Sequence, residues 1–238
     1  MSLRLEPSAA LREKRLARLL FERGLDRDDN RLGRIVEDAL LVGSLELAGL
    51  RVSWDEARAS DGAPPELVAI RQARAAVAPH QLLTVDAVRA WHEALAGRVG
   101  FRRRDLKGTR TPSGVPDTRP AAPPEFVQDR LVSLVEWLDA EGSAELAPEQ
   151  KAAVALARIV EIRPFDEANG RVSRLAASHV MTRAGLRPPI LVFGDAARLQ
   201  ATLEAAFRLD TAPLVDLIRE ASGRALDVMI QSLERKLV

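Results

Sequence analysis

The sequence predicts an all-α protein, and three observations support that prediction. Of the 238 residues, 47% are apolar and only 4% aromatic, so Leu, Ala and Val dominate over the aromatic residues that favour strands. Apolar residues recur at helical spacing along most of the chain. No run of alternating apolar and polar residues is long enough to form the core of a sheet.

Most of the expected helices have a recognisable start or end signal. Ser53 and Thr84 suit the N-cap position, Pro65 suits a first helical turn, and Gly49 and Gly185 suit helix ends. Together with the apolar spacing, these signals predict helices over residues 11–23, 29–47, 66–78, 85–96, 125–140, 148–162, 171–184 and 195–209, and one or two helices over 212–238, with a further helix start at residue 53.

Residues 97–124 interrupt this helical pattern. The segment contains four glycines and five prolines, has few apolar residues, and is locally basic. We therefore expect a long irregular segment or a short hairpin here, and long loops inside compact domains are usually functional or disordered. Judged by charge alone, a solvated loop is favoured over a binding site.

Charge and cysteine content limit the classes of partner. The 35 basic and 34 acidic residues nearly cancel, which argues against nucleic-acid or membrane partners. The absence of cysteine excludes disulfides, thiolate metal sites and a thiol nucleophile. Residues 1–27 lack the apolar region of a secretory signal, and no run approaches the roughly 20 apolar residues that span a bilayer. We expect a cytoplasmic protein.

Residues 163–174 carry the most informative chemistry. They combine two acids with an Asn-Gly turn, and arginines follow in the first turns of the next predicted helix. A helix N-terminus presents free backbone N–H groups and the positive end of the helix dipole, both of which attract anions. Arginines are unfavourable at that end unless a polyanion binds there. An upstream carboxylate suits a divalent cation bridging the same polyanion, so the segment predicts a phosphate site with a metal.

This segment resembles the signature of the Fic (Fido) family, His-Pro-Phe-x-(Asp/Glu)-Gly-Asn-Gly-Arg-x-x-Arg. The matching positions are Pro164, Phe165, Glu167, Asn169, Gly170, Arg171 and Arg174. We take the resemblance to cover residues 82–221 as the Fic core, with residues 1–81 as an N-terminal helical extension and 222–238 as a C-terminal helix. It implies an all-α fold and transfer of AMP from ATP to a hydroxyl of a target protein, with Mg²⁺.

The resemblance also implies a role for each matching position. Glu167 would hold Mg²⁺ at the α- and β-phosphates of ATP. Asn169 and Gly170 would belong to the anion-binding turn, and Arg171 and Arg174 would hold the nucleotide phosphates. Residues 97–120 would contain the family's flap, a short hairpin that binds an unidentified target protein by strand addition.

The first departure from the family pattern is Arg163, which stands at the position of the catalytic His. That His takes the proton of the target hydroxyl as the oxygen attacks the α-phosphate, a task suited to a base with a pKa near ~6.5. Arginine stays protonated in proteins and has no acceptor, so Arg163 cannot act as this base. Its loss is expected to slow the reaction by ~10²–10⁴-fold. Ala168 in place of Gly is a milder change.

The second departure lies upstream. Class II Fic proteins carry an inhibitory helix with the pattern Ser/Thr-x-x-x-Glu-Gly/Asn, whose Glu pairs with the second signature arginine. The best register here runs from Ser44 to Gly49 and places Ala48 at the Glu position. Glu46 is two residues off and would point away. Arg174 would then lack its carboxylate, and we expect nucleotide binding without this inhibition. Loss of the inhibitory Glu would carry no penalty in a protein that has also lost its base, because such a protein has no activity to restrain.

The other candidates are weaker. His92 and His179 lie on amphipathic helices and are best explained as structural, as are the three tryptophans, which we expect to be core anchors; His80 follows Pro79 in a turn. Asp166 is the nearest alternative base, but a carboxylate beside a triphosphate is poorly suited to that role.

Three functions therefore stay open. The first is a protein with an adenylyltransferase scaffold that binds ATP or another nucleotide and has weak or no transfer activity. The second is an active transferase of AMP or another phosphate-linked group that uses a different base or substrate-assisted chemistry. The third is a helical interaction module without nucleotide. A second copy of the chain is a further candidate partner.

Overall fold

Helices form almost all of the described protein, as the composition predicted. The computed structural model describes residues 9–26, 29–58, 62–106, 109–110, 116–117 and 119–235. Within these ranges the helices are α1 (Ala9–Arg23), α2 (Asn30–Glu46), α3 (Trp54–Arg58), α4 (Pro65–Ala75), α5 (Val85–Ala96), α6 (Val127–Asp139), α7 (Pro148–Ile162), α8 (Asn169–Arg183), α9 (Ala196–Ala206) and α10 (Ala212–Glu234). Short 3₁₀ turns occupy Pro124–Phe126, Glu141–Ser143 and Phe193–Asp195. The all-α prediction is confirmed.

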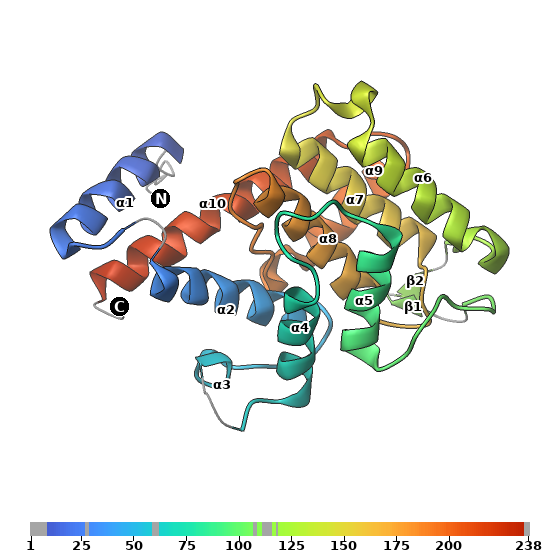
Figure 1. The fold of residues 1–238 in the computed structure, drawn as a ribbon, viewed down its shortest axis with the longest axis horizontal. Coiled ribbons are helices and arrows are strands. Elements are labelled where there is room, and N and C mark those ends of the chain that lie inside the picture. Colours follow the sequence, from blue (N-terminus) through green and yellow to red (C-terminus); the bar gives the residue numbers. More distant parts are fainter. Residues whose placement is uncertain are drawn as a thin grey trace.

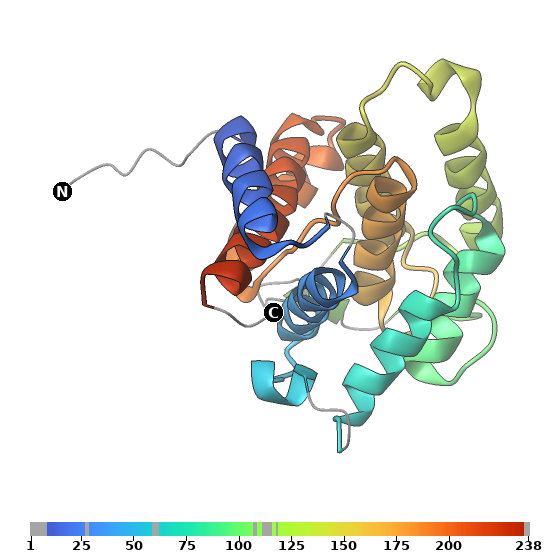
Figure 2. The same cartoon turned by 60° about the vertical axis from the view of Figure 1, so that its left-hand side comes forward.

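Helices α7 and α8 form the centre of the fold and share its most extensive helix–helix contact (Figure 1). Helices α5 and α6 pack beside this pair, and α9 and α10 cover α7. Helix α1 lies along the later part of α10, as both views show (Figures 1 and 2). The six-residue connection between α7 and α8, residues 163–168, therefore joins the two central helices of the fold.

The N-terminal helices share a core with the rest of the chain. Leu41 and Leu45 of α2 and Ile70 of α4 belong to the same buried cluster as Phe165 and Leu175, which flank the start of α8. The proposed extension, residues 1–81, is thus packed onto the signature region through a common apolar core. The proposed division at residue 222 falls inside α10, which runs without a break.

Local signals explain most helix limits. Thr84 Oγ1 accepts a hydrogen bond from the Ala87 N–H at 3.1 Å, and Gly97 ends α5 with φ 65°. Ser53 and Glu56 cap each other, since the Ser53 N–H donates to the Glu56 carboxylate at 2.7 Å and the Glu56 N–H donates to Ser53 Oγ at 3.2 Å. The predicted limits of α5 and of α7 are those observed, because each of these helices has a cap or a proline at the boundary.

Gly43 allows a close approach between α2 and the segment that precedes α9. A Cβ atom at this position would lie 2.1 Å from the carbonyl oxygen of Leu191, so only glycine lets α2 pack directly on the segment before α9. The next residue, Ser44, is buried and faces α8 as a result.

The expectation that all three tryptophans anchor the core is wrong for two of them. Trp91 is buried, but Trp54 is 45% exposed and Trp137 38% exposed. Helix α3 has only five residues and buries Ala57, so Trp54 has no core to enter. Trp137 lies instead at the wall of a cavity described below.

A two-residue antiparallel ladder joins β1 (Thr109–Arg110) to β2 (Pro116–Asp117), with Thr109 opposite Asp117. The remainder of the expected hairpin, residues 107–108, 111–115 and 118, lies outside the described residues, and a flap that binds a target stays a prediction. No helix in the described ranges is both long and apolar enough to cross a membrane.

Candidate functional site

The signature loop, residues 163–168, connects α7 to α8 and is held from within. Phe165 is fully buried, and its backbone N–H donates to Asn169 Oδ1 at 3.0 Å. Asn169 Nδ2 donates in return to the Phe165 carbonyl at 2.8 Å. Through these two hydrogen bonds Asn169 holds the second half of the loop, from Phe165 onward, in a closed turn. They also explain why an Asn is needed at the start of α8.

Two residues of this loop hold left-handed backbone although neither is glycine. Arg163 has φ 48° where α7 ends, and Ala168 has φ 62° immediately before α8. Such conformations cost of order 1 kcal/mol or more for residues with a Cβ and cluster at functional sites. The sequence signals were Pro164, which prevents α7 from continuing, and the Asn-Gly pair that follows Ala168.

The start of α8 is arranged for an anion. No side chain in the described part of the protein caps this helix, so its first backbone N–H groups remain available. Gly170 lies in the first turn, and a Cβ there would come within 3.2 Å of Arg174 Nη1. The glycine thus keeps the space between the first turn and Arg174 open.

Arg174 is a buried cation held by neutral groups. Its Nε donates to Ser44 Oγ at 2.9 Å and its Nη2 donates to the Ser44 carbonyl at 2.7 Å. Among the described residues no carboxylate pairs with it. Burial, and then the nearby charge of Arg171, lower the pKa of Arg174 to about 9. A buried charge without an opposite charge is costly, and this cation is therefore poised to receive an anion.

Arg171 shares this environment and is half-buried in the first turn of α8. Burial lowers the pKa of Arg171, whereas the charges of Glu167 and Glu66 act in the opposite direction. The structure thus brings Arg171 and Arg174 together beside the free end of α8, with Asn169 and Gly170 between the loop and the two cations. These four predicted residues form one cluster.

Glu167 is the one predicted metal ligand. Its side chain is 54% exposed and its nearest cationic partner, Arg98 Nη1, is 4.0 Å from Oε1, so the carboxylate is available to a ligand. The described residues contain no group of three His, Asp or Glu side chains that could hold a metal by themselves. A single accessible carboxylate fits Mg²⁺, which binds through one or two carboxylates together with substrate phosphates.

Arg163 is engaged in a different way. Its Nη2 donates to Asp117 Oδ2 at 2.5 Å, and both side chains are 7% exposed. Arg119 also binds Asp117, through Nε at 3.0 Å and Nη2 at 2.7 Å. Burial would raise the pKa of Asp117, but the hydrogen bonds from Arg119 and the charge of Arg163 outweigh it and hold that pKa below its usual value. Arg163 thus ties β2 to the end of α7.

Arg102 was missed at the sequence level, where it was one of several basic residues in the segment 97–124. It is 4% exposed and its Nε donates to the Arg163 carbonyl at 2.6 Å. Its Nη1 donates to the Arg104 carbonyl at 3.0 Å, and its backbone N–H donates to the Pro164 carbonyl at 3.0 Å. A cation at the carbonyl end of a helix is favourable, and Arg102 fixes the end of α7. No sequence signal distinguished it from Arg103.

The structure places the residues of the upstream pattern, Ser44 to Gly49, in two different surroundings. Ser44 contacts Arg174, as described above, whereas Ala48 and Gly49 lie exposed in the turn that follows α2. That turn is formed by Gly49, with φ 79°, and by a bond from the Leu50 N–H to the Leu45 carbonyl at 3.0 Å. The register of an inhibitory helix stays a prediction.

The two buried histidines have the structural surroundings that their helices indicated. His92 stacks on Phe165 with ring centroids 3.8 Å apart, and its Nδ1 contacts the Arg98 carbonyl at 3.2 Å. His179 contacts the Gln81 carbonyl through Nε2 at 2.8 Å and meets the edge of Trp91. Burial lowers the pKa of both imidazoles, so both are neutral near pH 7. His92 supports the signature loop by holding Phe165.

The chain is similar to a known protein family over its central region. The profile of the Fic/DOC family matches residues 82–181, which run from α5 through nearly all of α8 and include the whole signature loop. The family predicted from the signature is therefore confirmed.

Curated relatives share this region only. "Protein adenylyltransferase fic-1" of Caenorhabditis briggsae is 32% identical over 111 residues, which cover 47% of this chain and 22% of that protein. "Protein adenylyltransferase Fic" of Culex quinquefasciatus is 35% identical over 94 residues, 40% of this chain and 19% of that protein. The matched part spans about a fifth of the length of these relatives.

Solved structures extend the likeness to the fold of nearly the whole chain. A Fic domain containing signalling protein from Bacteroides thetaiotaomicron superposes with TM-score 0.74 at 19% identity, covering 96% of this chain and 97% of that chain. Fic-1 from Caenorhabditis elegans gives 0.71 at 21% identity, covering 96% and 74%. An IbpAFic2 variant in complex with adenylylated Cdc42 gives 0.51 at 17% identity, covering 92% and 72%. At these identities the likeness shows the fold alone.

Proposed function

Residues 82–181 form a domain of the Fic/DOC family, and we propose that the chain binds ATP at the start of α8 and transfers AMP from it weakly or not at all. The relatives named above are protein adenylyltransferases. Here the scaffold keeps the groups expected to hold the nucleotide and replaces the group expected to accept the proton.

Nucleotide binding is supported above all by Arg174. This cation is buried, its described partners are the neutral Ser44 hydroxyl and carbonyl, and its pKa is lowered to about 9. A phosphate oxygen would supply the missing opposite charge and restore the usual preference of the guanidinium for the protonated state. Arg171 and the uncapped N-terminus of α8 would hold the adjacent phosphates in the same way.

Glu167 would hold Mg²⁺ against the phosphates, as its exposure and position beside the loop allow. When bound, Mg²⁺ supplies charge neutralisation on the phosphates. Other divalent cations with oxygen ligands are alternatives that a binding experiment separates.

The weak transfer activity follows from the chemistry of Arg163. In AMP transfer the oxygen of a target hydroxyl forms a bond to the α-phosphorus, pyrophosphate leaves, and the hydroxyl proton must move to an acceptor. Arg163 has no acceptor atom, and its guanidinium is bound to Asp117 at 2.5 Å. Burial lowers the pKa of Arg163 while Asp117 raises it, and an arginine stays protonated in such a pair.

Docking of the target protein is proposed at residues 97–120, by addition of a strand to the ladder of β1 and β2. The support is that Asp117 in β2 is bonded to Arg163, which places this ladder beside the signature loop. A fold of this kind has been solved with an adenylylated protein, Cdc42, but the chemistry of the target of this chain stays open.

The test measures ATP binding and AMP transfer separately. Calorimetry with ATP and Mg²⁺ is expected to show binding to the unaltered chain. ATP labelled on its α-phosphate is expected to label neither the chain nor added proteins until Arg163 is changed to His, which should raise transfer by about 10²–10⁴-fold. The variant Arg163→Gln is the matched control, because it also frees Asp117 but supplies no base.

Each outcome bears on one part of the proposal. Robust labelling by the unaltered chain would exclude the loss of activity. Equal gains from Arg163→His and Arg163→Gln would show that release of Asp117, and not a base, limits the rate. Absence of ATP binding would exclude the nucleotide site and favour an interaction module.

A further inference from the structure

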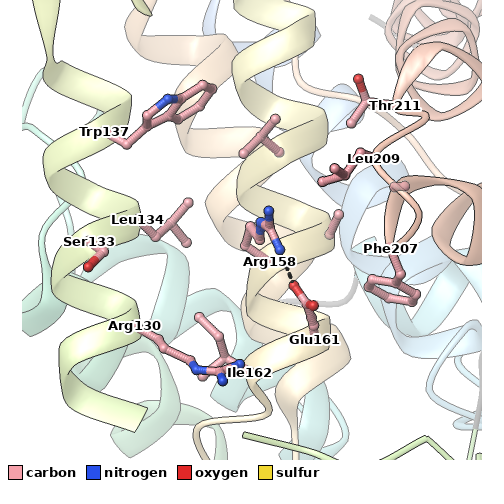
Figure 3. A pocket seen from close by; sticks show the side chains of 13 residues that line it. Arg130, Ser133, Leu134, Trp137, Arg158, Glu161, Ile162, Phe207, Leu209 and Thr211 are labelled. Atoms are coloured by element: carbon pink, nitrogen blue, oxygen red, sulfur yellow. Dashed lines mark hydrogen bonds and ion pairs between the residues drawn. The ribbon is translucent and has the colours of Figure 1, made fainter. Parts of the chain in front are cut away.

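A cavity of about 570 Å³ lies against α7, and none of its lining residues belongs to α8. Helix α7 forms its floor, α6 forms one wall, and the connection from α9 to α10 forms the other (Figure 3). None of Glu167, Arg171 and Arg174 lines it, so it is a second site and does not depend on nucleotide binding. Its size falls within the range of ~300–1,000 Å³ that is usual for small-molecule sites.

Two apolar side chains that line this cavity are exposed to solvent. Trp137 on α6 is 38% exposed and Leu209, between α9 and α10, is 78% exposed. Leu209 also holds a left-handed backbone, with φ 69°, in a turn where glycine is usual. An exposed and strained leucine beside an exposed tryptophan breaks two local preferences at one place. Natural sequences retain such violations mainly at functional sites.

The charges at the cavity favour one anionic group. Arg158 and Glu161 neutralise each other at 2.5 Å, as the dashed line in Figure 3 marks. Arg130 on α6 is exposed, and no carboxylate among the described residues pairs with it. The lining therefore has a net charge of one positive unit beside an apolar, partly aromatic surface. A carboxylate or sulfonate would bind a guanidinium with two parallel hydrogen bonds.

Phe207 connects this cavity to the signature loop. Its ring lines the cavity and also carries the Arg119 guanidinium, whose Cζ is 3.9 Å from the ring centroid. Arg119 in turn binds Asp117, and Asp117 binds Arg163. A ligand packed on Phe207 would restrict the ring and with it the position of Arg119. Three consecutive contacts thus join the cavity to β2 and to the end of α7.

From this combination we infer that the cavity binds an aromatic monoanion, with two or three apolar rings and one carboxylate or sulfonate, and that its occupancy steadies the Arg119–Asp117–Arg163 cluster. The rings pack between Trp137, Phe207 and Leu209, and the anionic group pairs with Arg130.

The probe for binding is 8-anilinonaphthalene-1-sulfonate, and its matched control is N-phenyl-1-naphthylamine, which has the same rings without the sulfonate. We expect one sulfonate probe per chain, with energy transfer from Trp137. Arg130→Gln should weaken the sulfonate probe about fivefold and leave the uncharged one unchanged. Arg183→Gln, an exposed cation outside the cavity, should change neither.

Binding that is insensitive to both Arg130→Gln and Trp137→Ala would overturn the site, as would equal effects of Arg130→Gln on the two probes. Circular dichroism of each variant separates loss of the site from loss of the fold. Both altered side chains are exposed, so the variants are expected to fold.

The link to Asp117 has its own readout. The Arg119 N–H donates to Asp117 Oδ1 at 3.1 Å, so its hydrogen exchange reports the cluster. The sulfonate probe should slow this exchange at least threefold in the unaltered chain. Phe207→Leu keeps an apolar wall but removes the ring face, so it should bind the probe within about twofold and lose the slowing. Unchanged exchange in the unaltered chain, or retained slowing in Phe207→Leu, would overturn the link.

Discussion

The two ends of the signature loop hold their buried arginines in opposite ways. At the end of α7, Arg163 meets the carboxylate of Asp117 at 2.5 Å. At the start of α8, Arg174 meets only the hydroxyl and carbonyl of Ser44 among its described contacts. A buried cation with a carboxylate is satisfied by the protein itself, whereas one with neutral partners gains most from an incoming anion. The difference separates an arginine held by an ion pair within the protein from one that we propose binds a ligand.

Removal of Asp117 tests the structural end and should have the largest effect. Asp117→Ala leaves Arg163 buried without its carboxylate, which we expect to lower the free energy of unfolding by about 3 kcal/mol. Urea denaturation measures this change. The double variant Asp117→Ala, Arg163→Met should recover most of the loss, because the buried guanidinium is removed together with its partner, and the remaining cation, Arg119, is 34% exposed and can be solvated. A loss below about 0.5 kcal/mol in the single variant would show that the pair is not structural.

Replacement of Arg174 tests the ligand-binding end. Arg174→Met removes a charge that would bind phosphate, which we expect to weaken ATP–Mg²⁺ about 30-fold, or about 2 kcal/mol, without a comparable loss of stability. Calorimetry measures the affinity and urea denaturation the stability. Arg163→Met is the matched control, expected to show the reverse pattern. Equal effects of the two variants on ATP affinity would remove the distinction between the two ends.

The pH dependence of ATP binding sharpens the same comparison. Arginine normally stays protonated, but burial and the charge of Arg171 lower the pKa of Arg174 to about 9 in the folded protein, so its charge is present at neutral pH and is lost as the pH rises through that value. ATP affinity should therefore fall about tenfold by pH 10, and Arg174→Met should lack this inflection.

The corresponding effect on stability has the opposite sign. The folded-state pKa of Arg174 lies below its ordinary value, so below pH 9 the folded protein carries the cost of the buried charge, and that cost is relieved as the pH rises further. A flat affinity profile between pH 8 and pH 10 would contradict the role of Arg174 in binding.

A carboxylate introduced beside Arg174 should give this arginine the kind of ion pair that Arg163 already has with Asp117. Ser44→Asp places an acid next to the Arg174 guanidinium, and we expect about a fivefold loss of ATP affinity from the competing ion pair. Ala48→Glu tests the predicted inhibitory register and should act in the same direction. Calorimetry measures both, with Glu46→Gln as the control. If neither variant changes ATP affinity, the idea of a lost internal inhibitor fails.

The sequence predicted those parts of the fold that depend on neighbouring residues. The limits of α5 and α7 were correct because Thr84, Gly97 and Pro164 act locally on the backbone. The anion site proposed at the start of α8 could be predicted from the sequence for the same reason, since its turn, its N–H groups and its arginines lie within a dozen residues. Predictions of this kind require no knowledge of long-range packing.

The contacts that the sequence did not predict join residues far apart in the chain. Asp117 and Arg163 are separated by 46 positions, and Ser44 and Arg174 by 130. Nothing in the local pattern marked Arg102 as the residue that holds the end of α7, or Trp137 as exposed, because both depend on which helices pack beside them.

By itself, then, the sequence predicted that the protein is helical and that it carries most of the Fic signature, and it places at residue 163 an arginine, which has no proton acceptor. These properties follow from side-chain chemistry and from short-range backbone preferences. The tertiary structure decided what each arginine is paired with: Asp117 from β2 reaches Arg163, and α2, packed closely at Gly43, presents Ser44 to Arg174. The physical reason is that the energy of a buried charge depends on its surroundings, and only the packed fold supplies them.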